Sequence, residues 1–153
     1  MLVAIDIGNT NILIGIINSE GLIQNQHRIS TVDLLNKEKS TLIELDNIFN
    51  DLKSISDYNF IIASVVPEAC NHLNHILKEI NVSANILIST DKVLGMKIDI
   101  DKPSELGTDR IVNAIAAVDE YKPPLVVIDF GTATTFDIID SDGTYKGGLI
   151  CPG

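Results

Sequence analysis

Apolar side chains fall into short runs that predict strands at both ends of the chain. Residues 2–7, 11–17 and 22–29 are rich in β-branched and other apolar residues, and short polar turns separate them, as in an antiparallel meander. Further apolar runs of strand length occupy residues 60–66, 85–89, 125–130, 134–139 and 144–150. Eight strands are therefore expected.

Three stretches instead repeat apolar residues every three or four positions, which is typical of amphipathic helices. They cover residues 33–52, 68–80 and 108–121, and Pro123 and Pro124 close the last one. Residues 90–107 show no period and contain three Gly or Pro residues. A connection of that length is often functional.

The resulting order, β-β-β-α-β-α-β-α, predicts an α/β fold of the ribonuclease-H-like type, with a mixed sheet and flanking helices. Residues 1–122 would form one complete domain, and residues 123–153 would begin a second one. The three strands of this second part are expected to lack a covering helix, which leaves their sheet poorly buried. The chain is therefore expected to hold one domain and the opening third of its duplicate.

The duplication rests on two similar strand–turn–strand segments. Residues 2–11 align without a gap with residues 125–134, so that Asp6 matches Asp129 and Gly8 matches Gly131. Such a tip brings a carboxylate to the end of a strand, where it can hold a hydrated cation, beside backbone N–H groups that can cradle a phosphate. An ordinary hairpin turn is the alternative for each segment alone.

Composition limits which partners the protein is expected to bind and which cellular compartment it is expected to occupy. With 11 basic and 21 acidic residues the formal net charge is −10, which argues against a nucleic acid. Cys70 and Cys151 have no disulfide or zinc-site spacing, so a reduced, cytoplasmic setting is expected. The chain has no apolar run of transmembrane length and no basic leader, so neither a membrane partner nor a signal peptide is expected.

A second candidate site lies where the long loop enters the helix at residue 108. Asp109 and Arg110 fall in the first turn, where the helix dipole favours an ionised carboxylate. That carboxylate is suited to accept a proton from a hydroxyl, and the guanidinium is suited to bind a substrate carboxylate. A simple helix start with a surface arginine is the alternative.

Asp6 and Asp129 could also be interpreted as the paired carboxylates of a two-metal nuclease. Against it, only these two acids occupy strand ends in the repeated motif, and the glycine tips favour phosphate binding.

Four motifs together resemble the type III pantothenate kinases, in order and in spacing, over residues 2–153. They are Asp6-Ile7-Gly8-Asn9-Thr10, Gly107-Thr108-Asp109-Arg110, Asp129-Phe130-Gly131-Thr132-Ala133 and Gly147-Gly148-Leu149-Ile150-Cys151-Pro152-Gly153. That family belongs to the superfamily of acetate and sugar kinases, Hsp70 and actin. The resemblance implies an actin-like ATPase fold and ATP-dependent phosphorylation of pantothenate to 4'-phosphopantothenate, the first step of coenzyme A biosynthesis.

The resemblance also implies roles for single residues. Asp109 would be the catalytic base, and Gly107, Thr108, Asp109 and Arg110 would bind pantothenate, with Arg110 near its carboxylate. Asp129 would bind a monovalent cation (K⁺ or NH₄⁺), Thr132 would contact ATP, and Mg²⁺ would sit at or near Asp6. The first ATP phosphate loop would comprise Asp6, Ile7, Gly8, Asn9, Thr10, Asn11, Ile12 and Leu13.

Two features depart from the family pattern. Ile100 stands where the family usually has a tyrosine in the substrate loop. Family members also continue for roughly another hundred residues, a domain-scale length that completes the second domain, the adenine pocket and much of a homodimer interface. A non-catalytic ATP-binding or regulatory relative, or a kinase with a different small acceptor, are therefore the alternatives.

Overall fold

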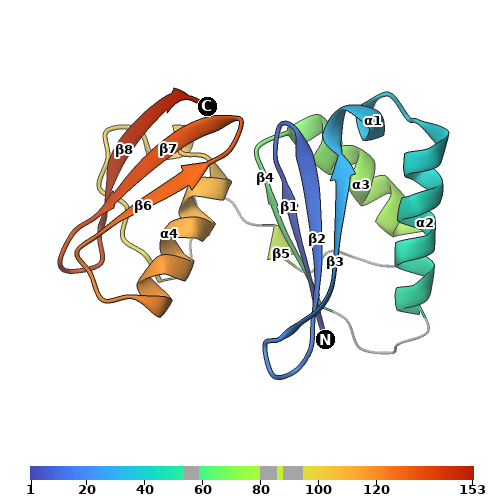
Figure 1. Ribbon diagram of the computed structural model, residues 1–153, viewed down its shortest axis with the longest axis horizontal. Helices are drawn as coiled ribbons and strands as arrows, with labels where there is room; N and C mark the ends of the chain where they lie inside the picture. The colour runs from blue at the N-terminus through green and yellow to red at the C-terminus, as the bar shows by residue number, and fades with distance from the viewer. Residues whose placement is uncertain (54–58, 80–85, 88–94) are drawn as a thin grey trace. The chain divides into compact units, whose positions relative to one another are not determined.

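The computed structural model describes residues 1–53, 59–79, 86–87 and 95–153. The chain divides into two compact units, Met1–Leu87 and Ile88–Gly153 (Figure 1). None of the helices in these described ranges is long and apolar enough to cross a membrane.

The first unit is built on a five-stranded mixed sheet in the order β3-β2-β1-β4-β5. The three N-terminal strands are antiparallel neighbours, whereas β1–β4 and β4–β5 pair in parallel, as expected of a ribonuclease-H-like domain. The strands are β1 (Leu2–Ile7), β2 (Asn11–Ile17), β3 (Ile23–Ser30), β4 (Asn59–Ser64) and β5 (Ile86–Leu87).

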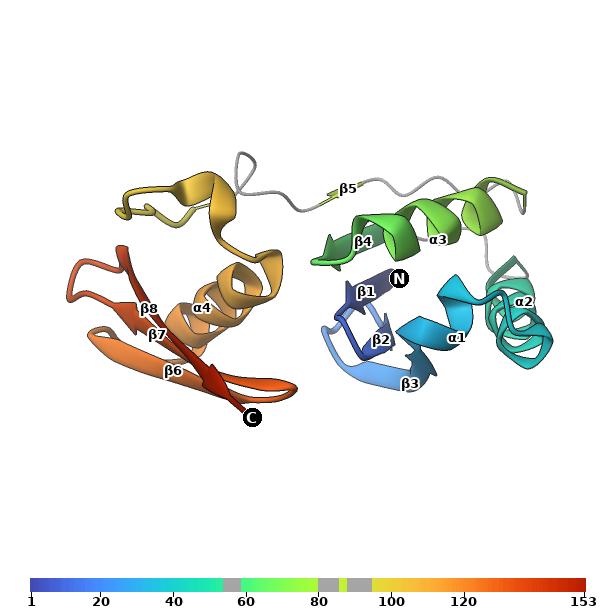
Figure 2. The ribbon, with the colours of Figure 1, turned by 90° about the horizontal axis from the view of Figure 1, so that it is seen from above.

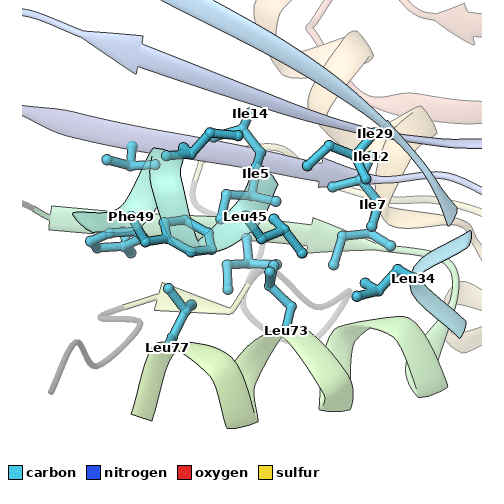
Figure 3. Packing of buried hydrophobic residues seen from close by; sticks show 14 of the residues in the cluster. Ile5, Ile7, Ile12, Ile14, Ile29, Leu34, Leu45, Phe49, Leu73 and Leu77 are labelled. Atoms are coloured by element: carbon cyan, nitrogen blue, oxygen red, sulfur yellow. The ribbon is translucent and has the colours of Figure 1, made fainter. Parts of the chain in front are cut away.

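Helices α1 (Thr31–Leu35), α2 (Lys39–Lys53) and α3 (Pro67–Glu79) lie on one face of this sheet (Figures 1 and 2). Alternate residues of β1 and β2 point into the core, where Leu73 and Leu77 of α3 meet them from the opposite side (Figure 3). The rings of Phe49 and Phe60 pack at a centroid distance of 6.4 Å. This core fixes β1, and with it the turn that carries Gly8.

The single helix predicted for residues 33–52 is wrong, because the structure divides that stretch into α1 and α2. Ser30 caps α1 by accepting a hydrogen bond from the Asp33 N–H at 3.2 Å, so the helix begins earlier than predicted. The break lies at Lys37, whose φ is 56°. No apolar residue lies between Leu35 and Leu42 to hold this segment on the sheet.

The second unit is a three-stranded antiparallel sheet in the order β6-β7-β8, with one helix on it (Figure 1). The expectation of an uncovered sheet is therefore wrong for one face. Ile111 and Ala114 of α4 pack with Ile139 and Tyr145 of the sheet. On the other face Phe130 is 81% exposed, together with Val126 and Leu149. The elements are a 3₁₀ turn, η2 (Pro103–Glu105), then α4 (Thr108–Glu120), β6 (Leu125–Phe130), β7 (Ala133–Ile139) and β8 (Tyr145–Pro152).

The remaining predicted strands and helices lie within two residues of their predicted bounds where the structure describes them. The strand predicted at residues 85–89 is described at 86–87, and residues 90–94 of the predicted loop lie outside the described residues. The division into compact units places α4 together with β6–β8. The predicted domains, residues 1–122 and 123–153, are instead defined by the duplicated sequence motif. The two criteria differ, and the duplicated-domain boundary stays a prediction.

Candidate functional site

The β1–β2 turn is a small, closed tip at the end of β1. The Gly8 N–H donates to the Asn11 carbonyl at 2.9 Å, and Asn9 and Thr10 are exposed. Thr31, the first residue of α1, holds the turn from behind: its hydroxyl donates to the Gly8 carbonyl at 2.7 Å and its N–H to the Thr10 carbonyl at 3.0 Å. Thr31 itself is buried.

These bonds orient the peptide groups of the tip. In a trans peptide the C=O and the N–H point in opposite directions. Because the Gly8 carbonyl is directed at Thr31, the Asn9 N–H is directed away from α1, on the exposed side of the turn. An outward N–H beside exposed amide and hydroxyl side chains is an arrangement suited to a phosphate.

Replacing Thr31 by Val should loosen this turn without changing the shape of the side chain much. The Gly8 carbonyl loses its donor, and we expect the free energy of unfolding to fall by about 1–3 kcal/mol. If the tip binds ATP phosphates, as the resemblance implies, the KM for ATP should also rise. Thr41→Val, at a second buried threonine that lies in α2 rather than α1, is the control. Equal ATP kinetics for the two variants would contradict a role for Thr31 at the tip.

The β6–β7 turn repeats the first one up to its glycine and then differs. Here the Gly131 N–H donates to the Ala133 carbonyl at 3.1 Å, one residue nearer than in the β1–β2 turn. Accordingly Asp6 pairs with Leu13 across its hairpin, but Asp129 pairs with Thr135. The ungapped alignment of residues 2–11 with 125–134 is therefore wrong beyond the glycine, because the second turn is one residue shorter.

Asp129 is exposed near the end of β6 and is tied to α4. Its Oδ2 accepts a hydrogen bond from Asn113 Nδ2 at 3.1 Å. The described residues contain no group of three or more Asp, Glu, His or Cys side chains placed to hold a metal ion. Thr132 lies exposed in the adjoining turn.

The start of α4 orders the second predicted site. Gly107 is the N-cap in an extended conformation, and Thr108 is buried behind it. The carboxylate of Asp109 accepts a hydrogen bond from the Arg110 N–H at 2.8 Å, so it is fixed in the first turn, half-buried. The four residues Gly107 to Arg110 thus form one local structure.

Arg110 is not the surface arginine of the simpler alternative. Its side chain is 13% exposed and is paired with Asp137 of β7, which is 1% exposed. Arg110 Nε donates to Asp137 Oδ1 at 2.7 Å, and Nη2 lies 2.6 Å from the same oxygen. Sequence reasoning missed Asp137, although an acid amid the apolar residues of a predicted strand was a usable signal.

Tyr145, at the start of β8, joins this pair: its hydroxyl donates to Asp137 Oδ1 in a short hydrogen bond. Burial is the main cause that raises the pKa of Tyr145, and its hydrogen bond and charge interaction with Asp137 raise it further. The phenol therefore remains a donor at neutral pH. We call Arg110, Asp137 and Tyr145 the arginine cluster.

The raised pKa of Tyr145 predicts alkaline destabilisation. Above pH 10, the ordinary tyrosine value, the unfolded chain releases the Tyr145 proton while the folded chain retains it. The free energy of unfolding should then fall by about 1.4 kcal/mol per pH unit from this residue. Urea unfolding of the wild type and of Tyr145→Phe between pH 9 and 11.5 measures it. Equal slopes in the two proteins would contradict the assignment.

Ile100, the departure from the family pattern, lies in the second unit beside β8. Its Cγ2 is 3.4 Å from the position that a Cβ on Gly147 would take. Ile98 pairs with Tyr145, and the Asp99 N–H donates to the Tyr145 carbonyl at 2.9 Å. The middle of the predicted loop therefore lies beside Tyr145 at the start of β8, the strand that contributes to the arginine cluster.

The predicted site residues thus fall into two groups. The first unit carries the phosphate-loop candidates Asp6, Ile7, Gly8, Asn9, Thr10, Asn11, Ile12 and Leu13. The second unit carries Gly107, Thr108, Asp109, Arg110, Asp129 and Thr132, and Arg110 and Asn113 of α4 bond to β7 and β6. That Asp6 and Asp129 face one ligand stays a prediction.

Comparison with known proteins gives one family. A family model described as type III pantothenate kinase matches residues 2–153. Curated proteins named type III pantothenate kinase from Citrifermentans bemidjiense and from Geobacter sp. (strain M21) are each 40% identical to the chain over 159 residues. All of the chain is covered, but only 60% of either relative, so the chain spans three fifths of the length of these relatives.

Solved structures support the fold. The ethanolamine utilization protein EutJ from Carboxydothermus hydrogenoformans has a TM-score of 0.50 at 18% identity, covering 98% of this chain and 51% of that protein. A candidate 2-dehydro-3-deoxygalactonokinase from Sinorhizobium meliloti has a TM-score of 0.51 at 13% identity, covering 98% and 53%. At these identities the likeness concerns the fold alone, and it agrees with the actin-like ATPase fold predicted from the sequence.

Proposed function

Because the chain belongs to the type III pantothenate kinase family, we propose that it carries residues for the ATP-dependent phosphorylation of pantothenate to 4'-phosphopantothenate, in coenzyme A biosynthesis. The observation that carries the proposal is the start of α4. There a fixed carboxylate, Asp109, adjoins a buried and oriented guanidinium, Arg110. This pair fits an acceptor that has both a hydroxyl and a carboxylate.

In the proposed reaction Asp109 accepts the proton of the pantothenate hydroxyl as its oxygen forms a bond to the γ-phosphorus of ATP. The bond from that phosphorus to the β–γ bridging oxygen breaks, and ADP leaves. Gly107, Thr108 and Arg110 hold the acceptor, with Arg110 at its carboxylate. Residues 6–13 hold ATP phosphates through the exposed side of the β1–β2 turn, and Thr132 contacts ATP. Phosphoryl transfer depends mainly on such positioning.

Cations complete the proposed site. Carboxylate oxygens at the strand ends are the donor type that Mg²⁺ and K⁺ prefer, so Asp6 fits Mg²⁺ and Asp129 fits a monovalent cation, K⁺ or NH₄⁺. Their charge would neutralise phosphate oxygens, which matters in a chain with a formal charge of −10.

A coupled assay of ADP formation tests the proposal. It uses the chain alone and the chain joined to the part of the C. bemidjiense relative that the chain does not cover. Each form is assayed with Mg²⁺ and ATP, with or without pantothenate, in K⁺ or in Na⁺. We expect pantothenate-dependent turnover that is faster in K⁺ in at least one form. If neither form depends on pantothenate, the proposed activity is wrong; equal rates in K⁺ and Na⁺ would remove only the role of Asp129.

A further inference from the structure

In the arginine cluster, several contacts fix the position of the Arg110 guanidinium. Three donor atoms converge on a single oxygen, Asp137 Oδ1: Nε and Nη2 of Arg110 and the hydroxyl of Tyr145. Arg110 Nη2 also donates to the Phe136 carbonyl at 3.3 Å. A free arginine side chain has about 2 kcal/mol of rotamer entropy. This set of contacts removes most of that freedom.

The backbone is shaped to admit the guanidinium. Gly148 of β8 pairs with Asp137, and a Cβ on Gly148 would lie 2.7 Å from Arg110 Nη2. The guanidinium therefore lies where the neighbouring strand has no side chain.

Arg110 pairs with Asp137 through one carboxylate oxygen rather than two. A carboxylate can receive a guanidinium on both of its oxygens in a two-bond fork. Here Asp137 Oδ2 is buried and has no hydrogen-bond partner within the described parts of the chain. The same is true of the hydroxyl of Thr135 on the same strand. The guanidinium atoms Nε and Nη2 thus meet a single carboxylate oxygen rather than the two oxygens of a fork.

The contacts also decide which part of Arg110 is left for a ligand. Asp137 occupies the edge formed by Nε and Nη2, whereas Nη1 has no hydrogen-bond partner among the described residues. The Asp109 carboxylate is fixed at the start of the same helix by the backbone N–H of Arg110. The base and the remaining guanidinium donors are thus held at a set separation on one helical turn.

We propose that Asp137 and Tyr145 are positioning residues for Arg110, which keep its Nη1 end directed to the carboxylate of the acceptor at a set distance from Asp109. The proposal rests on the proposed function. It assigns specificity for a hydroxy acid of one length to a buried carboxylate on β7 that does not itself touch the acceptor. A stabilising ion pair without this role is the competing explanation.

A double-mutant cycle separates the two explanations. In whichever form turns over pantothenate, Asp137→Asn keeps an acceptor oxygen but removes the charge. We expect KM for pantothenate to rise about tenfold, with kcat and KM for ATP within about twofold. In an Arg110→Met background the same substitution should leave KM for pantothenate unchanged, because there is no guanidinium left to position. If the ion pair only stabilises the fold, Asp137→Asn should instead lower the free energy of unfolding, and its effect on KM for pantothenate should not depend on Arg110.

Two further variants keep the test decisive. Tyr145→Phe retains the ion pair and should raise KM for pantothenate about threefold, so it serves if Asp137→Asn does not fold. Asp119→Asn, which changes an exposed acid near the C-terminal end of α4 in the same unit, should change neither KM. Turnover by the wild type with an unchanged KM in both cluster variants would overturn this proposal alone. No turnover by any wild-type form would remove the proposed function, and this proposal with it.

Discussion

Asparagine in place of Asp109 is expected to lower kcat for pantothenate phosphorylation by about 10²–10⁴-fold, the usual contribution of a general base. The substitution is nearly isosteric, and the amide oxygen can still accept the hydrogen bond from the Arg110 N–H. The start of α4 should therefore keep its shape. In the proposed reaction the variant would lose the ability to take a proton from the acceptor hydroxyl as the new P–O bond forms.

Binding and turnover must be measured separately to support that assignment. The Kd for ATP should match that of the wild type, because the phosphate-loop candidates lie in β1 and β2 rather than in α4. Asp119→Asn, an exposed acid near the other end of the same helix, should leave kcat unchanged. If Asp109→Asn turned over pantothenate at the wild-type rate, Asp109 would not be the base.

Patterns of short range account for what the sequence predicted well. The alternation in β1 and β2 and the three- or four-residue spacing in α3 and α4 result from burial on one face, which is a local property. The long helix failed because residues 36–41 offer nothing apolar to the sheet, so the backbone turned at Lys37. The apolar spacing over the whole of residues 33–52 suggested one helix and concealed the polar segment 36–41 within it.

The arginine cluster shows the limit of motif reasoning. Asp109 and Arg110 were found because they are adjacent in sequence, but Asp137 lies 27 residues from Arg110 and approaches it only through the packing of α4 on β7. Thr31 was likewise missed as the support of Gly8, from which it lies 23 residues away. Contacts of this kind depend on how strands and helices pack, and no local pattern reports them.

Alanine in place of Gly148 should be the most damaging small substitution in the second unit. Its Cβ would lie 1.7 Å from the Phe136 carbonyl oxygen and 2.8 Å from the carbonyl carbon, both backbone atoms of the paired strand. A flexible side chain could move aside, but here β7 and β8 must separate or Arg110 must leave Asp137. We expect the free energy of unfolding to fall by more than about 3 kcal/mol, at the upper end of the cost of overpacking.

Gly15→Ala provides the matched control, because it also adds one methyl group to a glycine in a strand. Its Cβ would meet only the Ala4 carbonyl oxygen, at 3.9 Å, which is an ordinary van der Waals contact. The two sites differ in that β2 is an interior strand of its sheet and β8 is an edge strand. Urea unfolding of both variants should therefore show a large loss for Gly148→Ala and a change within about 1 kcal/mol for Gly15→Ala. Similar stabilities would mean that Arg110 and the Phe136 carbonyl do not approach β8 closely, and the geometry of the arginine cluster would have to be abandoned.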